Sequence, residues 1–231
     1  MTLEGLRGTP TVFADDLQQL RPHPGQARCA ANIRTLVADS GILAAAHAEF
    51  QRNHVQDAYS IRCSPQVTGA VRDTADYATT VANRELAAAI DNPVVTLDGR
   101  VVSNGNFHGA PIAYVLDFLA IAVADLASIS ERRTDRFLDV ARNRGLNAFL
   151  ADDPGVDSGH MIAQYTQASI VSELKRNAAP ASVDSIPSSA MQEDHVSMGW
   201  SAGRKLRRSI DGLARVLAIE ILPAARAIDL R

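Results

Sequence analysis

Aromatic residues are scarce in this sequence: they make up 5% of its 231 residues, although 46% of the chain is hydrophobic. Strands favour aromatic and β-branched side chains, whereas alanine, which recurs throughout the hydrophobic stretches, is the strongest helix former. The composition therefore argues against a β-rich protein and favours packed helices. The length suffices for one large domain or two small ones.

Cysteine and an excess of one charge are also lacking. The two cysteines, Cys29 and Cys63, form no Cys-x-x-Cys pair, so we expect no disulfide framework and a reducing, cytoplasmic location. A net charge of −3 with mixed signs argues against nucleic acid or an anionic membrane as a partner. The longest apolar run, residues 112–129, carries Asp117 and Asp125 and therefore predicts a core helix and no membrane span.

Two further signals are missing. The first eight residues lack a basic start followed by an apolar run, so we expect no signal peptide. His108, His160 and His195 do not recur at the spacing that places ligands on one helix face, and there is no cysteine cluster, so we expect no metal site.

What the sequence does contain is hydrophobic periodicity at 3.6 residues, which is typical of helices. Helices are predicted over residues 26–38, 67–90, 110–138, 160–177 and a C-terminal stretch from about residue 206. We expect Gly41 to end the first helix, Asp157 or Ser158 to cap the fourth, and Pro223 to end or kink the last. The turn dipeptide Asp98-Gly99 predicts a small hairpin over residues 94–102.

A row of four polar residues, Gln192, Glu193, Asp194 and His195, stands between small and apolar neighbours in residues 185–199. Buried carboxylates need partners, and neighbouring carboxylate and imidazole groups shift one another's pKa, which is useful in an active site. The alternative is a helix N-terminus whose acidic residues face the positive end of the helix dipole.

A second polar segment, residues 55–66, contains Gln56, Asp57, Tyr59 and Arg62. Arg62 has the planar fork that binds a carboxylate through two parallel hydrogen bonds, and Tyr59 can donate or accept a proton nearby. The alternative is a surface loop in which Arg62 pairs with Asp57.

A third segment, residues 103–109, has two glycines and two asparagines around Phe107 and His108. Such residues permit unusual backbone angles and the close approach of a ligand. The alternative role of Phe107 and His108 is packing.

Taken in order, these segments resemble the histidine ammonia-lyases. The resemblance rests on Gln-Asp-Ala-Tyr-Ser-Ile-Arg at residues 56–62, Gly-Asn-Phe-His-Gly at 105–109, Pro-Ala-Ser-Val-Asp-Ser-Ile-Pro at 180–187 and Gln-Glu-Asp-His at 192–195. It extends from about Leu3 to the last residue. Residues 106–108 and 192–195 are more similar to the histidine branch than to the plant-type phenylalanine branch, and bacterial tyrosine ammonia-lyases and aminomutases remain alternatives.

The resemblance implies an all-α, long-helix bundle of the aromatic amino acid lyase type, an architecture shared with fumarase and aspartase. It implies that residues 1–231 form a single helical domain, equivalent to the C-terminal half of such an enzyme. Family members are homotetramers whose active sites take residues from more than one subunit.

The same resemblance implies roles for individual residues. Arg62 would bind the substrate carboxylate, and Gln56 and the catalytic Tyr59 would lie beside the amine and the electrophile. Phe107 would pack on the ring of the methylidene-imidazolone cofactor. Gln192 and the catalytic Glu193 would contact the imidazole of L-histidine or the departing amine.

The reaction implied is the conversion of histidine to urocanate and ammonia, the start of histidine degradation. The family forms its methylidene-imidazolone from an Ala-Ser-Gly tripeptide, which occurs nowhere in this sequence, and the loop that carries the family's tyrosine base is also missing. We therefore expect the chain to contribute substrate-binding residues and to be inactive without an N-terminal half. The alternatives are a non-catalytic helical assembly subunit and a cofactor-free lyase of the fumarase type.

Overall fold

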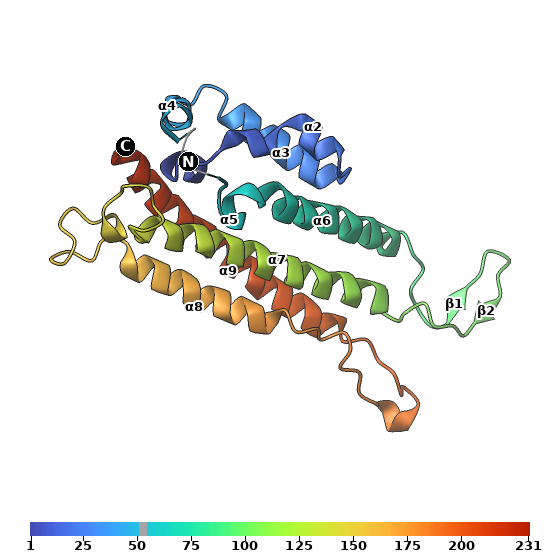
Figure 1. The fold of residues 1–231 in the computed structure, drawn as a ribbon. Coiled ribbons are helices and arrows are strands. Elements are labelled where there is room, and N and C mark those ends of the chain that lie inside the picture. The colour runs from blue at the N-terminus through green and yellow to red at the C-terminus, as the bar shows by residue number, and fades with distance from the viewer. Residues whose placement is uncertain (51–54) are drawn as a thin grey trace.

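The computed structural model describes residues 1–50 and 55–231. Among the described residues, the fold is dominated by long helices that lie side by side (Figure 1). They are α6 (Ser64–Leu86), α7 (Ala110–Leu138), α8 (Met161–Asn177) and α9 (Gly199–Asp229). Helix α7 is central, because it packs against α6, α8 and α9. The predicted all-α bundle is confirmed; its treatment as a single domain stays a prediction.

Shorter elements cover one end and one side of the bundle (Figure 1). Helix α3 packs along α6, and α1 packs on α9. These elements are α1 (Thr2–Gly5), η1 (Pro10–Phe13), α2 (Asp15–Gln19), α3 (Pro24–Leu36), α4 (Gly41–Phe50), α5 (Tyr59–Arg62) and η2 (Ala148–Leu150). One further short element, η3 (Ser189–Met191), lies on the arm that projects from the bundle before α9 (Figure 1).

The seam between α7 and α9 is built from small side chains. Ala113, Ala120, Ala124 and Ala127 of α7 are at most 5% exposed, and small residues allow two helix backbones to approach closely. Larger residues then close the core on either side of this seam; Ala124 and Ala127, for example, pack with Val216 of α9. The alanine-rich side of α7 is therefore the side that the bundle buries most completely.

Two buried ion pairs also join α7 to α9. Asp117 accepts a hydrogen bond from Lys205 at 2.7 Å, and Glu220 pairs with Arg133 at 2.6 Å. Burial alone would raise the pKa of Glu220, but its contacts with Arg133 hold the pKa below its ordinary range. By length and composition α7 is the one helix in the described part of the chain that could cross a membrane, yet its contacts here are those of a core helix.

The predicted helix end at Gly41 is wrong, and Pro223 does not end its helix; a kink at Pro223 stays a prediction. Gly41 begins α4 instead of ending α3, because α3 already stops at Leu36 and the Ser40 hydroxyl accepts the Leu43 N–H at 3.3 Å. Pro223 lies inside α9, which continues to Asp229. Proline removes one helix hydrogen bond, but here the following turns are held by burial in the core cluster that contains Ala224 and Ala227.

The predicted cap of α8 is wrong as well. The residue before α8 is His160, and it makes no side-chain cap. The Asp157 carboxylate instead accepts the N–H groups of Gly159 at 2.5 Å and Asp152 at 2.9 Å. It therefore organises the loop that precedes the helix.

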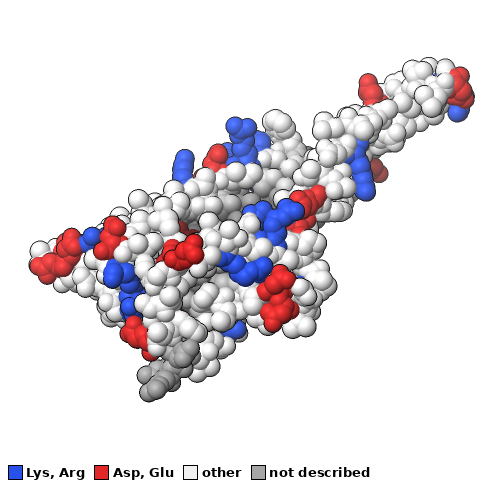
Figure 2. Space-filling view, turned by 90° about the horizontal axis from the view of Figure 1, so that it is seen from above, with Lys and Arg blue, Asp and Glu red and all other residues white. Residues whose placement is uncertain are grey.

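The predicted hairpin is confirmed. Strands β1 (Val94–Val95) and β2 (Val101–Val102) pair in antiparallel register, and Gly99 adopts a φ of 83° that favours glycine. The hairpin projects from the bundle as an arm (Figures 1 and 2). On the face shown in Figure 2, acidic and basic side chains are interspersed over the molecule.

Candidate functional site

Arg62 lies at the end of α5, in a position fixed by its own segment. Its Nε–H donates to the backbone carbonyl of Asp57 at 2.8 Å, and its guanidinium carbon lies 4.5 Å from the centre of the Tyr59 ring. The Asp57 carboxylate pairs with Arg144 at 2.6 Å and accepts the Thr9 N–H at 2.6 Å. The alternative in which Arg62 forms an ion pair with Asp57 is therefore wrong.

The rest of the Arg62 guanidinium is available for a ligand. Within residues 1–50 and 55–231, no carboxylate pairs with Arg62. Tyr59 is 70% exposed and Gln56 is exposed beside it. A guanidinium that is held through Nε and one ring face presents its remaining N–H groups to a carboxylate. The segment can therefore bind the carboxylate of a small molecule.

Residues 185–199 form an arm that ends where α9 begins, at Gly199. The alternative of a helix N-terminus at Glu193 is wrong, because the polar row stands before the helix in a tight turn. Ser188 and Glu193 close that turn through Ser188 N–H to Glu193 carbonyl at 2.9 Å and Ser188 hydroxyl to Glu193 carboxylate at 2.6 Å. Hydrogen bonds from the hydroxyls of Ser188 and Ser189 hold the pKa of Glu193 below its ordinary range.

The turn that carries Glu193 has a strained backbone. Ser189, Ala190 and Met191 have φ values of 49°, 52° and 72°, a left-handed conformation that costs about 1–2 kcal/mol per non-glycine residue. Strain of this kind gathers at functional sites, where it holds a side chain in one orientation. Gln192 and Glu193 are exposed on this arm, so the polar row is not buried within one chain.

The glycine-rich loop, residues 103–109, meets this arm through two histidines. The rings of His108 and His195 stack with centroids 5.7 Å apart and planes 9° apart, and His108 Nε2 lies 3.1 Å from the His195 carbonyl oxygen. Phe107 is 56% exposed next to this pair. The sequence carried no signal for the contact, because the two histidines are 87 residues apart.

The predicted site residues fall into two groups at opposite ends of the bundle (Figure 1). Gln56, Tyr59 and Arg62 lie near Arg133 of α7, since Arg133 approaches the Ser60 carbonyl at 3.4 Å. The other group, Phe107, Gln192 and Glu193, lies near the start of α7.

The distance between the two groups follows from the geometry of α7. A helix rises about 1.5 Å per residue, which places Ala110 and Arg133 roughly 35 Å apart. An amino acid is far shorter than this. One copy of the chain therefore cannot present both groups to the same substrate molecule.

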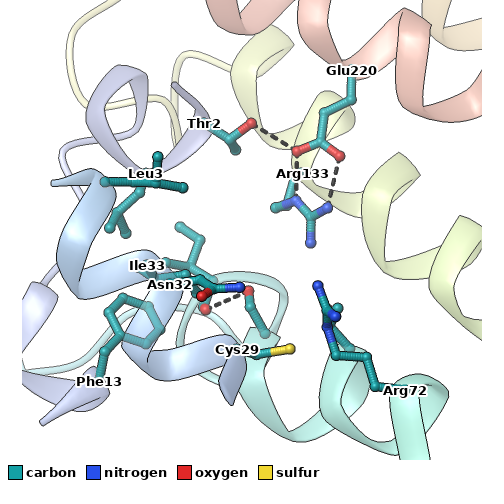
Figure 3. A pocket seen from close by; sticks show the side chains of 13 residues that line it. Thr2, Leu3, Phe13, Cys29, Asn32, Ile33, Arg72, Arg133 and Glu220 are labelled. Carbon is teal, nitrogen blue, oxygen red and sulfur yellow. Dashed lines mark hydrogen bonds and ion pairs between the residues drawn. The ribbon is translucent and has the colours of Figure 1, made fainter. Parts of the chain in front are cut away.

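A separate pocket of about 390 Å³ lies behind α5 (Figure 3). Figure 3 shows Arg72 and Arg133, the latter paired with Glu220, on one side of the pocket, and the apolar side chains of Phe13 and Ile33 on the opposite side. None of the predicted site residues lines it. In the part of the chain that the structure describes, no group of three metal-ligating side chains is gathered at any point.

Comparisons with known proteins fit this geometry. A family model described as aromatic amino acid lyase matches residues 1–231. Histidine ammonia-lyase from Streptomyces coelicolor is 66% identical over the whole chain, and the same-named protein from Streptomyces griseus is 64% identical. The chain spans about 45% of the length of these curated relatives.

Solved structures agree with the fold. Histidine ammonia-lyase from Trypanosoma cruzi matches with a TM-score of 0.87 and 44% identity, over 99% of this chain and 42% of that one. Tyrosine aminomutase from Streptomyces globisporus matches with a TM-score of 0.93 and 38% identity, over 99% of this chain and 47% of that one.

Proposed function

Because this chain belongs to the aromatic amino acid lyase family, we propose that it serves as the C-terminal part of a histidine ammonia-lyase, an enzyme that forms urocanate and ammonia from histidine. The observation that carries the proposal is the identity of 64–66% over all 231 residues with three Streptomyces proteins of that name. Since the chain spans about 45% of their length, turnover belongs to a larger assembly.

The Arg62 end of the bundle would bind the amino acid part of the substrate. Its guanidinium, supported by the Asp57 carbonyl and the Tyr59 ring, would hold the substrate carboxylate through two parallel hydrogen bonds. The Tyr59 hydroxyl and the Gln56 amide would lie beside the amine and help to orient it. This arrangement places the amine and the β-carbon at a fixed distance from Arg62.

The arm that carries Glu193 would bind the side chain of the substrate or the departing amine. A carboxylate whose pKa is held low by Ser188 and Ser189 stays an acceptor and receives an N–H bond from an imidazole. Gln192 would add a second polar contact. A site built to pair with an N–H group rejects analogues that lack one.

One residue fits the methylidene-imidazolone cofactor of the family. Phe107, 56% exposed on a glycine-rich loop, offers a free aromatic face to a flat ring. When bound, the cofactor supplies the electrophile that makes the amine a leaving group. Its Ala-Ser-Gly precursor is missing from all 231 residues, so this chain can pack against the group but cannot form it.

The assembly would be a homo-oligomer, a tetramer on the family pattern, or a complex with an N-terminal half. Two observations support this. The two groups of site residues lie at opposite ends of one chain, and apolar residues on α7 and α9 are exposed. Among them are Tyr114 (58%), Phe118 (47%), Ile121 (49%) and Trp200 (81%). Exposed apolar faces of this size mark contact surfaces. A cytoplasmic location rests on cysteine usage alone.

A second candidate is a tyrosine aminomutase or tyrosine ammonia-lyase. The TM-score of 0.93 with the Streptomyces globisporus tyrosine aminomutase exceeds the 0.87 with the Trypanosoma cruzi histidine ammonia-lyase. Sequence identity points the other way, at 38% against 44% for these two structures. The TM-score reflects the bundle that both enzymes share, whereas the sequence identity, together with the 64–66% identity to the curated histidine ammonia-lyases, favours histidine as the substrate.

The test is urocanate formation, measured by ultraviolet absorbance, for three preparations: the 231-residue chain alone, the chain co-expressed with the remaining N-terminal part of the Streptomyces coelicolor relative, and the same pair carrying Arg62→Met. We expect no urocanate from the chain alone, urocanate from the co-expressed pair, and a severe loss of rate when the pair carries Arg62→Met.

The β-proton of an amino acid is too weakly acidic for a side-chain base without an electrophile, so turnover by the chain alone would contradict the proposal. A stable complex that acts on tyrosine and not on histidine would support the second candidate, and one that acts on neither would support a non-catalytic assembly role.

A further inference from the structure

A second cavity, of about 240 Å³, is lined by Asp57 but not by Arg62. Its apolar floor is formed by Leu6 and Ile61. Its charged lining comprises one carboxylate, that of Asp57, and three guanidinium groups, those of Arg136, Arg142 and Arg144.

The three guanidinium groups differ in how they are neutralised. Arg144 pairs with Asp57 at 2.6 Å, and Arg142 pairs with Asp135 at 2.9 Å and with Asp139 at 2.6 Å. Arg136 makes no ion pair or hydrogen bond with any residue that the structure describes.

Arg136 is half-buried, and its surroundings disfavour an additional positive charge. Burial lowers its pKa, as do the nearby charges of Arg142 and Arg144, while Asp57 and Asp135 act in the opposite direction without contacting it. A partly buried charge without a partner is costly. An anion in the cavity would remove that cost and would not displace an existing partner of Arg136.

The backbone beside the cavity is held in a costly conformation. Arg144 has a φ of 59° and is followed by Gly145 with a φ of 89°. The left-handed conformation suits glycine but is strained for arginine. The Arg144 guanidinium of this strained segment pairs with Asp57 in the cavity lining, and strained backbone of this kind gathers at binding sites.

Further positive charge lies just outside. Arg231 donates hydrogen bonds to the carbonyl oxygens of Gly5 and Asn143, both at 2.8 Å. Burial, followed by the charges of Arg7 and Arg144, lowers the pKa of Arg231 to about 10. Arg231 also donates to the carbonyl oxygen of Arg144 at 2.8 Å, so a further positive charge lies next to a residue that lines the cavity.

We propose that this cavity is a binding site for a small oxyanion of the phosphate class, held by Arg136 with help from Arg142 and Arg144. Guanidinium groups match tetrahedral phosphate oxygens through paired N–H donors, and a dianion suits a cavity with more than one of them. The site is distinct from Arg62, which does not line it, and the inference does not depend on the proposed enzymatic function.

Binding of an anion in this cavity would change the position of Arg62 through Asp57. The carboxylate of Asp57 holds Arg144, and the backbone carbonyl of the same residue holds the Nε of Arg62. An anion that draws Arg144 towards itself would therefore alter the support of Arg62. Nuclear magnetic resonance can follow this through the Nε–H signal of Arg62.

The experiment is isothermal titration of the 231-residue chain with inorganic phosphate at constant ionic strength. We expect one saturable site and at least about tenfold weaker binding for Arg136→Gln, because the variant loses its charged hydrogen bonds to the anion. The matched control is Arg208→Gln, an equal change of charge at an exposed position of α9, which should bind as the unaltered chain does. Phosphate binding that is unchanged in Arg136→Gln would overturn the proposal.

Two further arms keep the test decisive. If Arg136→Gln fails to fold by circular dichroism, Arg136→Lys retains the charge without the fork and should still bind phosphate more weakly than the unaltered chain; equal binding would overturn the proposal. Acetate and chloride are titrated in parallel at the same ionic strength. If acetate and chloride both bind more weakly than phosphate, the result supports a phosphate site. If either of them binds as tightly as phosphate, the proposal is overturned.

Discussion

The two ends of the bundle hold their candidate site residues in different ways. At the Arg62 end, Asp57 is only 4% exposed, and Arg144 and the Thr9 N–H bind its carboxylate. At the other end, Glu193 is exposed and is held by Ser188, five residues away, within its own turn. The first group is built into the core by distant parts of the chain, whereas the second is shaped locally and projects outward.

The two ends therefore differ in how far the fold of a single chain determines their structure. A single copy has what it needs to position Arg62, because residues far apart in the sequence already meet there. The arm and the hairpin have few such contacts, and segments of that kind open locally at low cost in free energy. Substitutions at the projecting end should therefore affect turnover more than the stability of the bundle.

The largest effect is expected for Arg133→Met in the buried seam. The variant leaves the Glu220 carboxylate, 6% exposed, without its cation, and breaking a buried pair in this way typically costs about 3–5 kcal/mol. Urea unfolding followed by circular dichroism measures the loss.

The matched control for this variant is Arg100→Met in the hairpin, which removes an equally short but exposed pair with Asp98. We expect its unfolding midpoint to equal that of the unaltered chain. Equal losses in both variants would show that the two regions do not differ in their contribution to stability.

Arg62→Lys should affect catalysis strongly and stability weakly. In a complete enzyme we expect kcat/KM for histidine to fall by about 2–4 kcal/mol of transition-state binding, because lysine cannot make two parallel bonds to a carboxylate. Steady-state kinetics and urea unfolding of the same preparation separate the two effects. A near-normal kcat/KM would make Arg62 a structural residue.

At the projecting end, Glu193→Gln should affect substrate choice more than stability. The exposed carboxylate should matter little to the unfolding midpoint, but we expect histidine turnover to fall roughly tenfold more than any tyrosine turnover, since only the imidazole offers an N–H to it. Rates with both substrates on one complete enzyme preparation measure the ratio. Equal losses on the two substrates would exclude a role in specificity.

The sequence predicted well what depends on local patterns. Periodicity located the long helices, the Asp98-Gly99 dipeptide located the hairpin, and the resemblance to the family pointed to both groups of candidate site residues. Gly41 does not end a helix and Pro223 does not end α9, because a serine hydroxyl and tertiary packing decide those positions and local propensity is only a weak guide.

The sequence did not predict how far apart the two groups of site residues lie in the folded chain. Nothing in the order of the motifs indicates that Arg62 and Glu193 lie at opposite ends of α7. The contacts between His108 and His195 and between Arg144 and Asp57 each join residues 87 positions apart. Such pairs leave no periodic trace, so only the folded chain reveals them.

The smallest effect concerns acid stability and again separates the seam from the hairpin. Because the folded pKa of Glu220 is below its ordinary value of 4.5, its charge stabilises the fold above pH 4.5, and this contribution is lost as the pH falls through the lowered pKa. Urea midpoints measured from pH 7 to pH 3 should therefore decline less steeply below pH 4.5 in Glu220→Gln, which starts from a lower stability.

Asp98 also has a lowered pKa, through hydrogen bonds with Thr96 and Arg100, but it is exposed on the projecting hairpin, so Asp98→Asn should leave the acid decline of the bundle unchanged. If the urea midpoint falls with pH as steeply in Glu220→Gln as in the unaltered chain, or less steeply in Asp98→Asn, the Glu220 carboxylate in the buried seam is not the source of the acid sensitivity.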